Sequence, residues 1–509
     1  MRATISIAVL IAAAATARSA DTLVLCPPAL QPALADWIEF RREQGHAITL
    51  AQPGRTFDEN RKLARAAYER GGLRHLLLVG DTTVLPCGHE PLQVISRWGP
   101  DKTAATDHGY ADLAGDAAPE IAVGRIPFSS PAQLRRYLRR VIDYERGSAT
   151  IPTNARLSVV ASPGNFSPLL DRVLEASATR VLEEATPPGV DLNVTYASPA
   201  SRWYPGRDRL HNAVADSLVS GSLAWVYLGH GLPDRLDAAP SKSGARPLLD
   251  TQTLPRTTTR HPTPVACMLA CYTGSFDRRD PCLAEAMLTM PSGPLTVVAA
   301  STVSMPYGNS RLGLALLRTL FRVEEPSAEN RATAGEMLRS SKHAAMDAGS
   351  PGDLGRVLDQ VAQAFGPTGD QARERVEHLY AYNLLGDPLV AIRPPMRLAV
   401  EVQRDSGGKA ALVCHTPIAG KLFWRIVGQN HELAGAGGGW ESAGSVSAGR
   451  HPLELALPPA ITSQSEDPRI VHVRVDSSEG LAVGIATLIP GERLGNVAAK
   501  PAATPQVVQ

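Results

Sequence analysis

Apolar residues fall in short runs along the first 300 residues of the chain. Runs of strand length, bounded by turn-forming residues, occupy positions 22–25, 76–79, 121–123, 157–161, 224–228, 265–269 and 295–299. Segments with a helical spacing of apolar residues lie between them, at 29–44, 61–70, 131–146, 169–184, 208–220 and 282–290. Apolar strands that alternate with helices are typical of a largely parallel sheet covered on both faces. The pattern therefore predicts an α/β fold.

The same pattern divides the chain into parts. A polar stretch at 145–148, followed by Pro152, marks a seam between two α/β portions, 21–150 and 151–394, and helices are expected from 311 to about 384. Short runs separated by Gly, Ser, Asn and Asp come next, at 398–402, 411–415, 422–426, 453–457, 470–475 and 481–488. They predict a small immunoglobulin-type β-sandwich over 395–490. The Ala/Pro/Gln-rich tail, 491–509, is expected to be disordered.

The first 20 residues have the layout of a secretory signal. Arg2 precedes an apolar run at 5–15, and Ala15-Thr16-Ala17 provides small residues for cleavage. The alternative is a buried N-terminal helix. The sequence has no later run of 18 apolar residues, so no membrane span is expected. We therefore expect an exported protein that is periplasmic, attached to the cell surface or secreted.

Charge and cysteine content limit the possible partners and kinds of site. The chain has 51 Lys and Arg against 50 Asp and Glu, a formal net charge of +1, which argues against nucleic acid or an anionic membrane as the main partner. Six cysteines in 509 residues are too few for a disulfide scaffold. No CxxC pair is present, which argues against a zinc site.

Two predicted strands run directly into residues that carry chemistry. The run 224–228 leads into Gly-His230-Gly231, and the run 265–269 leads into Cys271, with a glycine three residues later. The carboxyl ends of parallel strands share one edge of a sheet, so an imidazole and a thiol can meet there. The histidine would ionise the thiol, and the amides of Gly231 and Cys271 would hold an oxyanion.

Each of these features alone also has a structural explanation. Gly-His-Gly is common in turns, and a cysteine at the end of a strand is often a small buried apolar residue. Cys267, inside its strand, and Cys282, at the start of a helix, are expected to serve packing only. His89, His108 and His261 are the rival histidines, and each lies in a predicted loop with no such cysteine nearby.

Further motifs follow one another in a recognisable order. They are Leu-Leu-Leu-Val-Gly-Asp81, Thr-Asp107-His-Gly-Tyr-Ala-Asp112, Ile-Ala-Val-Gly-Arg125-Ile-Pro, Leu-Gly-His230-Gly231, Ala-Cys271-Tyr-Thr-Gly-Ser-Phe, Pro-Cys282-Leu-Ala-Glu285, Ala-Ser301-Thr and Leu-Gly-Asp387-Pro. Over roughly residues 21–393 this order resembles the gingipain family of cysteine peptidases. The resemblance implies a caspase-like α/β/α sandwich in two subdomains, followed by an immunoglobulin-like domain. It also implies polypeptide substrates, no required cofactor, His230 as acid and base, and Cys271 as nucleophile.

The chain also departs from this family. No carboxylate occurs at 160–165, where gingipains have an acidic partner for the histidine, so a backbone carbonyl is expected to orient His230. The loop that carries a pocket aspartate in arginine-specific members is shortened, and Asp171 is a distant candidate for that role. Tyr307 would form an aromatic wall of the same pocket. A basic residue before the scissile bond is the first expectation from the resemblance. No long pro-segment is expected between the signal and Thr22.

Acidic residues gather in one predicted loop. Asp107, Asp112, Asp116 and Glu120 supply oxygen ligands of the kind that calcium prefers, close to Gly115. The alternative is a solvated turn in which these side chains bind local amides. Calcium is therefore a structural ion to be tested. Asp387, in Gly-Asp-Pro, is expected to be a structural turn residue.

Three classes of function fit these features. The first is an endopeptidase that works through an acyl-enzyme. The second is a surface acyl transferase, or transpeptidase, of the same family. The third is a catalytically silent adhesion module that uses the β-sandwich. Intact His230 and Cys271 argue against the third, and the sequence does not separate the first two.

Overall fold

A computed structural model of the chain describes residues 20–146, 156–164, 175–176, 178–180, 182–183, 185–187, 189–241, 244–255, 263–321, 332–347, 354–365, 369–393, 395–404, 409–427, 440–453, 469–477, 481–488 and 493–494. The predicted signal segment, most of the seam near residue 150, most of the predicted helix at 169–184 and nearly all of the tail lie outside the described residues.

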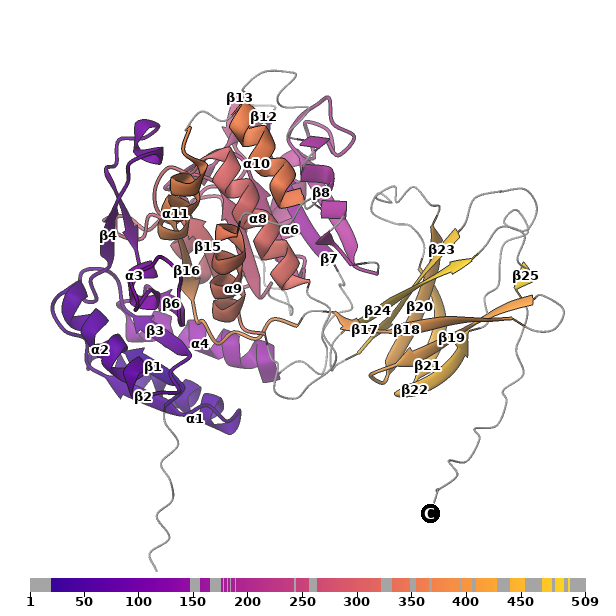
Figure 1. The fold of residues 1–509 in the computed structure, drawn as a ribbon, viewed down its shortest axis with the longest axis horizontal. Coiled ribbons are helices and arrows are strands. Elements are labelled where there is room, and N and C mark those ends of the chain that lie inside the picture. Colours follow the sequence, from indigo (N-terminus) through magenta and orange to yellow (C-terminus); the bar gives the residue numbers. More distant parts are fainter. Residues whose placement is uncertain are drawn as a thin grey trace, which may run out of the picture.

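The α/β part is built on one continuous ten-stranded sheet (Figure 1). In sheet order the strands are β2 (Ile48–Ala51), β1 (Thr22–Leu25), β3 (His75–Val79), β6 (Ala122–Ile126), β16 (Tyr382–Gly386), β15 (Thr296–Ala300), β14 (Val265–Leu269), β9 (Ala224–Leu228), β7 (Arg156–Ala161) and β8 (Asp191–Tyr196). β16 runs parallel to β6 but antiparallel to β15, and the other neighbours are parallel. The two halves of the sheet therefore run in opposite directions and end at opposite edges.

Helices cover both faces of this sheet. On one face, Leu23 and Leu76 pack with Tyr110 of the short helix α3 (His108–Ala111). On the other, Val24 packs with Trp37 of α1 (Ala35–Glu43). Successive strand residues point to opposite faces, so consecutive apolar residues in β1 serve both layers. The α/β/α sandwich predicted from the sequence is confirmed.

Further helices of the α/β part lie within the described residues. They are η1 (Gln31–Leu34), α2 (Phe57–Glu69), η2 (Ile95–Arg97), α4 (Pro131–Arg146), α6 (Leu210–Val219), α7 (Leu283–Thr289), α8 (Pro306–Leu320), α9 (Ala334–Met346), α10 (Leu354–Phe365) and α11 (Gln371–Ala381). Helix α8 packs against α9, α10 and α11. Three small hairpins pair β4 (Gly88–Pro91) with β5 (Thr103–Thr106), β10 (Gly231–Leu232) with β11 (Arg235–Leu236), and β12 (Ala238–Ser241) with β13 (Gly244–Pro247).

One expectation about the second half of the chain is wrong. Helices were expected to about residue 384, but α11 ends at Ala381 and the next five residues form β16. Every residue of β16 is buried, and the strand lies between β6 and β15 at the centre of the sheet. The five residues Tyr-Asn-Leu-Leu-Gly are too few to show a period that separates a strand from a helix, so their partners in the sheet decide the conformation.

The C-terminal part is a β-sandwich of two sheets. One contains β17 (Met396–Arg397), β24 (Leu481–Leu488), β23 (Arg469–Asp476), β20 (Gly420–Val427) and β21 (Glu441–Val446). The other contains β18 (Ala399–Arg404), β19 (Lys409–Thr416), β22 (Gly449–Leu453) and β25 (Arg493–Leu494). Leu412 from one sheet and Trp424 and Val473 from the other lie in one buried cluster. This sandwich confirms the predicted immunoglobulin-like fold.

One carboxylate links the sandwich to the edge of the large sheet, beside the packing of Leu481 and Val483 on the α/β core. Asp191, at the start of β8, accepts hydrogen bonds from Arg425 at 3.0 Å, from Arg474 at 3.1 Å and from the indole of Trp440 at 3.1 Å. Both guanidinium groups also lie over the Trp440 ring.

Across the described parts of the chain, none of the helices combines the length and the apolar character needed to cross a bilayer.

Candidate active site

The sheet brings His230 and Cys271 to the same edge. Strands β9 and β14 are parallel neighbours in which Leu228 pairs with Leu269, and each candidate residue follows two positions later. Neighbouring strands are about 4.8 Å apart, so equal offsets from a paired position keep the two side chains close. His230 and Cys271 also line the same cavity. The arrangement predicted for these two residues therefore agrees with the topology of the fold.

Cys271 differs from the other five cysteines in its exposure. It is partly exposed, whereas Cys26, Cys87, Cys267, Cys282 and Cys414 are buried, and all six are free thiols. Burial raises the pKa of Cys267 to about 12, and the pKa values of the other four buried thiols are raised for the same main reason. Cys267 and Cys282 lie in the main buried core, which agrees with the packing role expected of them, and Cys267 also lines the cavity.

The sulfur of Cys271 lies against a segment that sequence reasoning did not single out. Sγ is 3.3 Å from the amide nitrogen and 3.3 Å from the carbonyl oxygen of Ser304, and the Ser304 hydroxyl lies at 3.8 Å. The thiol can donate to this carbonyl oxygen, and the sulfur accepts from the amide and lies within reach of the hydroxyl, so Ser304 fixes the position of the sulfur. Ser304 follows the Ser-Thr-Val run after β15, and nothing in the sequence marks it as a partner of Cys271.

His230 is exposed on the rim and is oriented by a backbone carbonyl. Its Nε2 lies 2.9 Å from the carbonyl oxygen of Gly164, beyond the end of β7. A carbonyl only accepts, so Nε2 carries the proton and Nδ1 is the basic nitrogen of the neutral ring. The hydroxyl of Tyr227 also donates to the His230 carbonyl oxygen at 2.8 Å. The Gly164 contact agrees with the expectation that a backbone carbonyl orients His230.

Gly231 brings its backbone close to the nucleophile. A Cβ at this position would lie 2.7 Å from the carbonyl oxygen of Cys271, so only glycine allows the approach. The amide of Asp237 donates to the His230 carbonyl at 3.1 Å, which makes Gly231 and Leu236 a non-hydrogen-bonded pair of the β10–β11 ladder. The Gly231 amide is therefore not used by this ladder, as an oxyanion donor requires.

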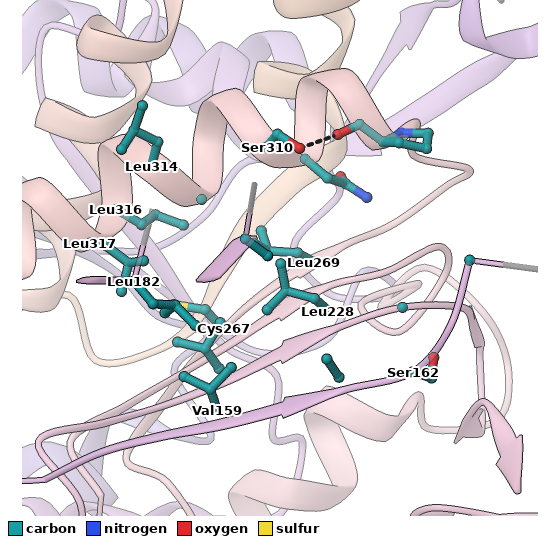
Figure 2. Close-up of a pocket in the computed structure, with 18 of the residues that line it drawn as sticks. Val159, Ser162, Leu182, Leu228, Cys267, Leu269, Ser310, Leu314, Leu316 and Leu317 are labelled. Atoms are coloured by element: carbon teal, nitrogen blue, oxygen red, sulfur yellow. Dashed lines mark hydrogen bonds between the residues drawn. The ribbon is translucent and has the colours of Figure 1, made fainter. Parts of the chain in front are cut away.

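The cavity beside the dyad has a volume of about 400 Å³. Figure 2 shows Leu228 and Leu269 on the strand side of the cavity and Leu316 and Leu317 on the side of α8. Among the described wall residues, Glu175 is the one carboxylate, and it accepts a hydrogen bond from the Ser201 hydroxyl at 2.7 Å. The wall that the structure describes is therefore mainly apolar.

Tyr307, the pocket residue that the resemblance implies, is hydrogen-bonded to neighbouring helices. The described cavity wall does not include Tyr307, which is buried in α8. Its hydroxyl donates to Asp359 at 2.7 Å and accepts from Arg375 at 2.5 Å. This ring joins α8 to α10 and α11, so its placement gives no support to a role as a pocket wall. Asp171, the distant candidate for the pocket acid, lies outside the described residues.

The acidic loop separates into two sets. Asp107 is buried and forms a two-pronged ion pair with Arg125, at 2.7 Å for both contacts, so it is not a free ligand. Asp112, Asp116 and Glu120 do converge, with one carboxylate oxygen of each within 4.8 Å of the others. However, Asp112 accepts from three loop amides and Glu120 accepts from two. These contacts explain the loop without an ion, and calcium stays a prediction.

The rival histidines are placed differently. His108 is buried beside Lys342, and this burial lowers its pKa well below the usual value. His89 is exposed on β4, 3.8 Å from Asp277. Neither lines the cavity with Cys271 in the part that the structure describes, and His261 lies outside the described residues.

Three buried side chains of α11 hold the segments that line the cavity. Glu377 accepts from the amides of Gln93 and Ile95, and His378 Nε2 accepts from the amide of Met305 at 2.9 Å. Glu374 accepts from the amide of Gly308 at 3.1 Å. Sequence reasoning missed these residues, although their spacing of three and four positions places them on one helix face.

Comparison with solved structures agrees with the fold. The Arg-specific cysteine proteinase gingipain R (RgpB) has a TM-score of 0.55 and 17% identity to this chain, covering 92% of this chain and 98% of its own. The complex of Porphyromonas gingivalis RgpB pro- and mature domains also gives 0.55 and 17%, covering 91% and 99%. At this identity the likeness establishes the fold. A search of curated proteins gave no significant match.

The family of the chain follows from its sequence. The model of peptidase family C25 matches residues 15–393, which is well over half of the chain and includes both His230 and Cys271. The match covers the whole ten-stranded sheet and ends before the β-sandwich. The chain therefore belongs to peptidase family C25, the gingipain family, and is a cysteine-type endopeptidase.

Proposed function

We propose that this chain is an exported endopeptidase that cleaves polypeptides through an acyl-enzyme on Cys271, with His230 as its general base and acid. The observation that carries the proposal is the common offset of both residues from the paired Leu228 and Leu269, beside one cavity. The signal-like layout of residues 1–20 supports export.

The geometry supports a definite proton path. Nε2 of His230 donates to Gly164, so Nδ1 accepts the thiol proton and the sulfur attacks the substrate carbonyl carbon. The resulting oxyanion is held by the amides of Gly231 and Cys271. The imidazolium then protonates the leaving amine, the C–N bond breaks, and a thioester remains on Cys271. Water, deprotonated by His230, hydrolyses the thioester and releases the acid.

Replacing the histidine tests this path. His230→Ala should reduce the hydrolysis of peptide amides far more than that of activated esters, because an activated leaving group needs little protonation. Cys271→Ala should abolish both, and Cys267→Ala should retain both at some cost in stability. If His230→Ala cleaved amides at the wild-type rate, the proposed role of the histidine would be wrong.

The same assay separates hydrolysis from acyl transfer. The reaction is run with and without an added amine, and the products are identified by mass spectrometry. The proposal predicts the free acid as the main product in both cases. A main product in which the amine is joined to the acyl fragment would instead identify a transpeptidase. No cleavage or transfer by the wild-type protein would favour an adhesion module.

A further inference from the structure

An exposed tryptophan stands at the mouth of the cavity. Trp98 is 52% exposed and lines the same cavity as Cys271 and His230. It belongs to the segment 92–102 between β4 and β5, more than 100 residues before either member of the dyad. The dyad mechanism gives this side chain no role.

The segment that carries Trp98 is held from beneath by a buried carboxylate. The side chain of Glu377 is fully buried and accepts hydrogen bonds from the amides of Gln93 at 2.7 Å, Val94 at 3.1 Å and Ile95 at 2.9 Å. Arg373 pairs with the same carboxylate at 3.0 Å. Three amides that converge on one anion fix the backbone at the start of η2, so Trp98 stands on a rigid support.

The segment also packs directly on the residues around the nucleophile. Leu92 and Ile95 form one buried cluster with Val303 and Met305, and Cys271 and Tyr272 pack against it. At Gly99, beside the tryptophan, a Cβ would lie 2.6 Å from the Tyr272 hydroxyl. The segment that carries Trp98 therefore packs against the residues around Cys271. Val303 and Met305 line the same cavity as Trp98.

A single exposed apolar residue is ordinary on a protein surface. Trp98 differs because it stands on a rigid segment beside a reactive thiol. An indole offers a large apolar area while ordering only two side-chain torsions. Val303 and Met305, which line the same cavity, carry no charge. The carboxylate of Asp101, in the same segment, accepts a hydrogen bond from the Thr302 hydroxyl at 3.4 Å. These properties suit contact with an apolar group.

We propose that Trp98 is a specificity-determining residue that binds an aliphatic or aromatic side chain of the polypeptide substrate close to the scissile bond. This inference rests on the proposed peptidase function and names a substrate preference for that site. It differs from the basic preference that the family resemblance implies. The indole covers the apolar side chain and removes it from water, and this contact contributes to binding in the transition state.

A peptide library tests the inference. Fluorogenic peptides are varied, one position at a time, at three residues on each side of the cleaved bond, with Leu, Phe, Ala, Lys and Glu. The wild-type enzyme should prefer Leu or Phe at one of these positions. Trp98→Ala should lower kcat/KM for those peptides about tenfold or more and leave the Ala peptides nearly unchanged. Trp98→Phe should restore most of the preference.

A control and a second readout keep this test separate from that of the dyad. Tyr68 on α2 is 39% exposed and lies outside the cavity wall, so Tyr68→Ala should keep the wild-type preference. Cys271 of Trp98→Ala should still react with iodoacetamide. The inference is overturned if the wild type shows no apolar preference. It is also overturned if Trp98→Ala changes all peptides equally or acts mainly on the Lys peptides.

Discussion

The carbonyl oxygen of Gly164 lies 2.9 Å from Nε2 of His230. Because a carbonyl oxygen can only accept a hydrogen bond, Nε2 is the donor. A backbone carbonyl thus stands where a carboxylate would orient the ring in a Ser-His-Asp type of site. It fixes the tautomer, but it adds no full negative charge to stabilise the imidazolium. The orientation of His230 therefore depends on backbone geometry near the ends of β7 and β9.

Gly229 is the position at which this geometry can be disturbed most directly. Its φ of +155° is one that residues with a side chain rarely adopt, and a Cβ would clash with Ser162 Oγ and lie 2.6 Å from the Tyr227 hydroxyl. Gly229→Ala should move His230 and lower kcat/KM by about 100-fold. Gly45, with φ of +93° and no atom within 4 Å of a new Cβ, is the matched control. Gly45→Ala should keep full activity, and equal losses in both variants would refute the local explanation.

Glu377 should act as a positioning residue for the Trp98 segment. Glu377→Gln keeps one acceptor oxygen but removes the charge that faces three amides and Arg373. We expect a stability loss of about 1–3 kcal/mol and a selective loss of turnover for peptides with apolar residues. Combining it with Trp98→Ala should add little further selectivity loss, because both changes disturb one contact.

The control for this cycle is Glu69→Gln on α2, where the carboxylate is exposed and pairs with Arg65. It should change neither stability nor selectivity measurably. Library turnover and thermal unfolding of the single and double variants provide the measurements. Fully additive selectivity losses from Glu377→Gln and Trp98→Ala would show that Glu377 does not act through Trp98.

Much of this arrangement could be predicted from the sequence. Apolar runs of four or five residues ending in Gly-His-Gly and in Cys are local signals, and parallel neighbours place their ends at one edge. The positioning contacts could not be predicted, because they join distant residues. Gly164 and His230 are 66 residues apart, and Glu377 lies 282 residues after Ile95.

Other family motifs proved to be structural rather than catalytic. Asp387 accepts from Trp37 Nε1 and Arg41 Nη2, both at 2.7 Å, at the sheet edge opposite the dyad. Arg125 and Asp107 form a buried ion pair. A motif shows that a residue type is needed, but only the fold shows whether it is needed for packing or for chemistry.

β21 was missed because its Ser- and Gly-containing, largely exposed sequence has no apolar pattern.

His75 should make the protein sensitive to acid. It is buried in β3, neither ring nitrogen has a hydrogen-bond partner, and burial lowers its pKa to about 4. The unfolded chain binds the proton at higher pH than the folded chain does. The folded state therefore loses stability as the pH falls from about 6.5, the pKa of histidine in the unfolded chain, to about 4, the pKa of His75 in the folded chain. The total loss is on the order of 3 kcal/mol.

His75→Leu should remove this contribution and also the cost of two buried nitrogens that make no hydrogen bond, although Nε2 lies 3.7 Å from Glu336. Unfolding in urea, measured from pH 7 to pH 4.5, should show a smaller acid-induced loss for the variant than for the wild type. His89→Leu is the control, because His89 is exposed and should leave the acid dependence unchanged. Identical pH profiles for wild type and His75→Leu would contradict the assignment to His75.

The central claim is that Cys271 is the reactive nucleophile, and site-resolved alkylation of the native protein tests it most directly. The protein is treated with iodoacetamide near neutral pH, residual activity is followed, and the modified cysteine is located by peptide mass spectrometry. The five other thiols are buried and have raised pKa values. The account predicts one label, on Cys271, that rises in proportion to the loss of peptidase activity and forms more slowly in His230→Ala. Activity loss that follows the labelling of another cysteine, or full activity with Cys271 modified, would contradict it.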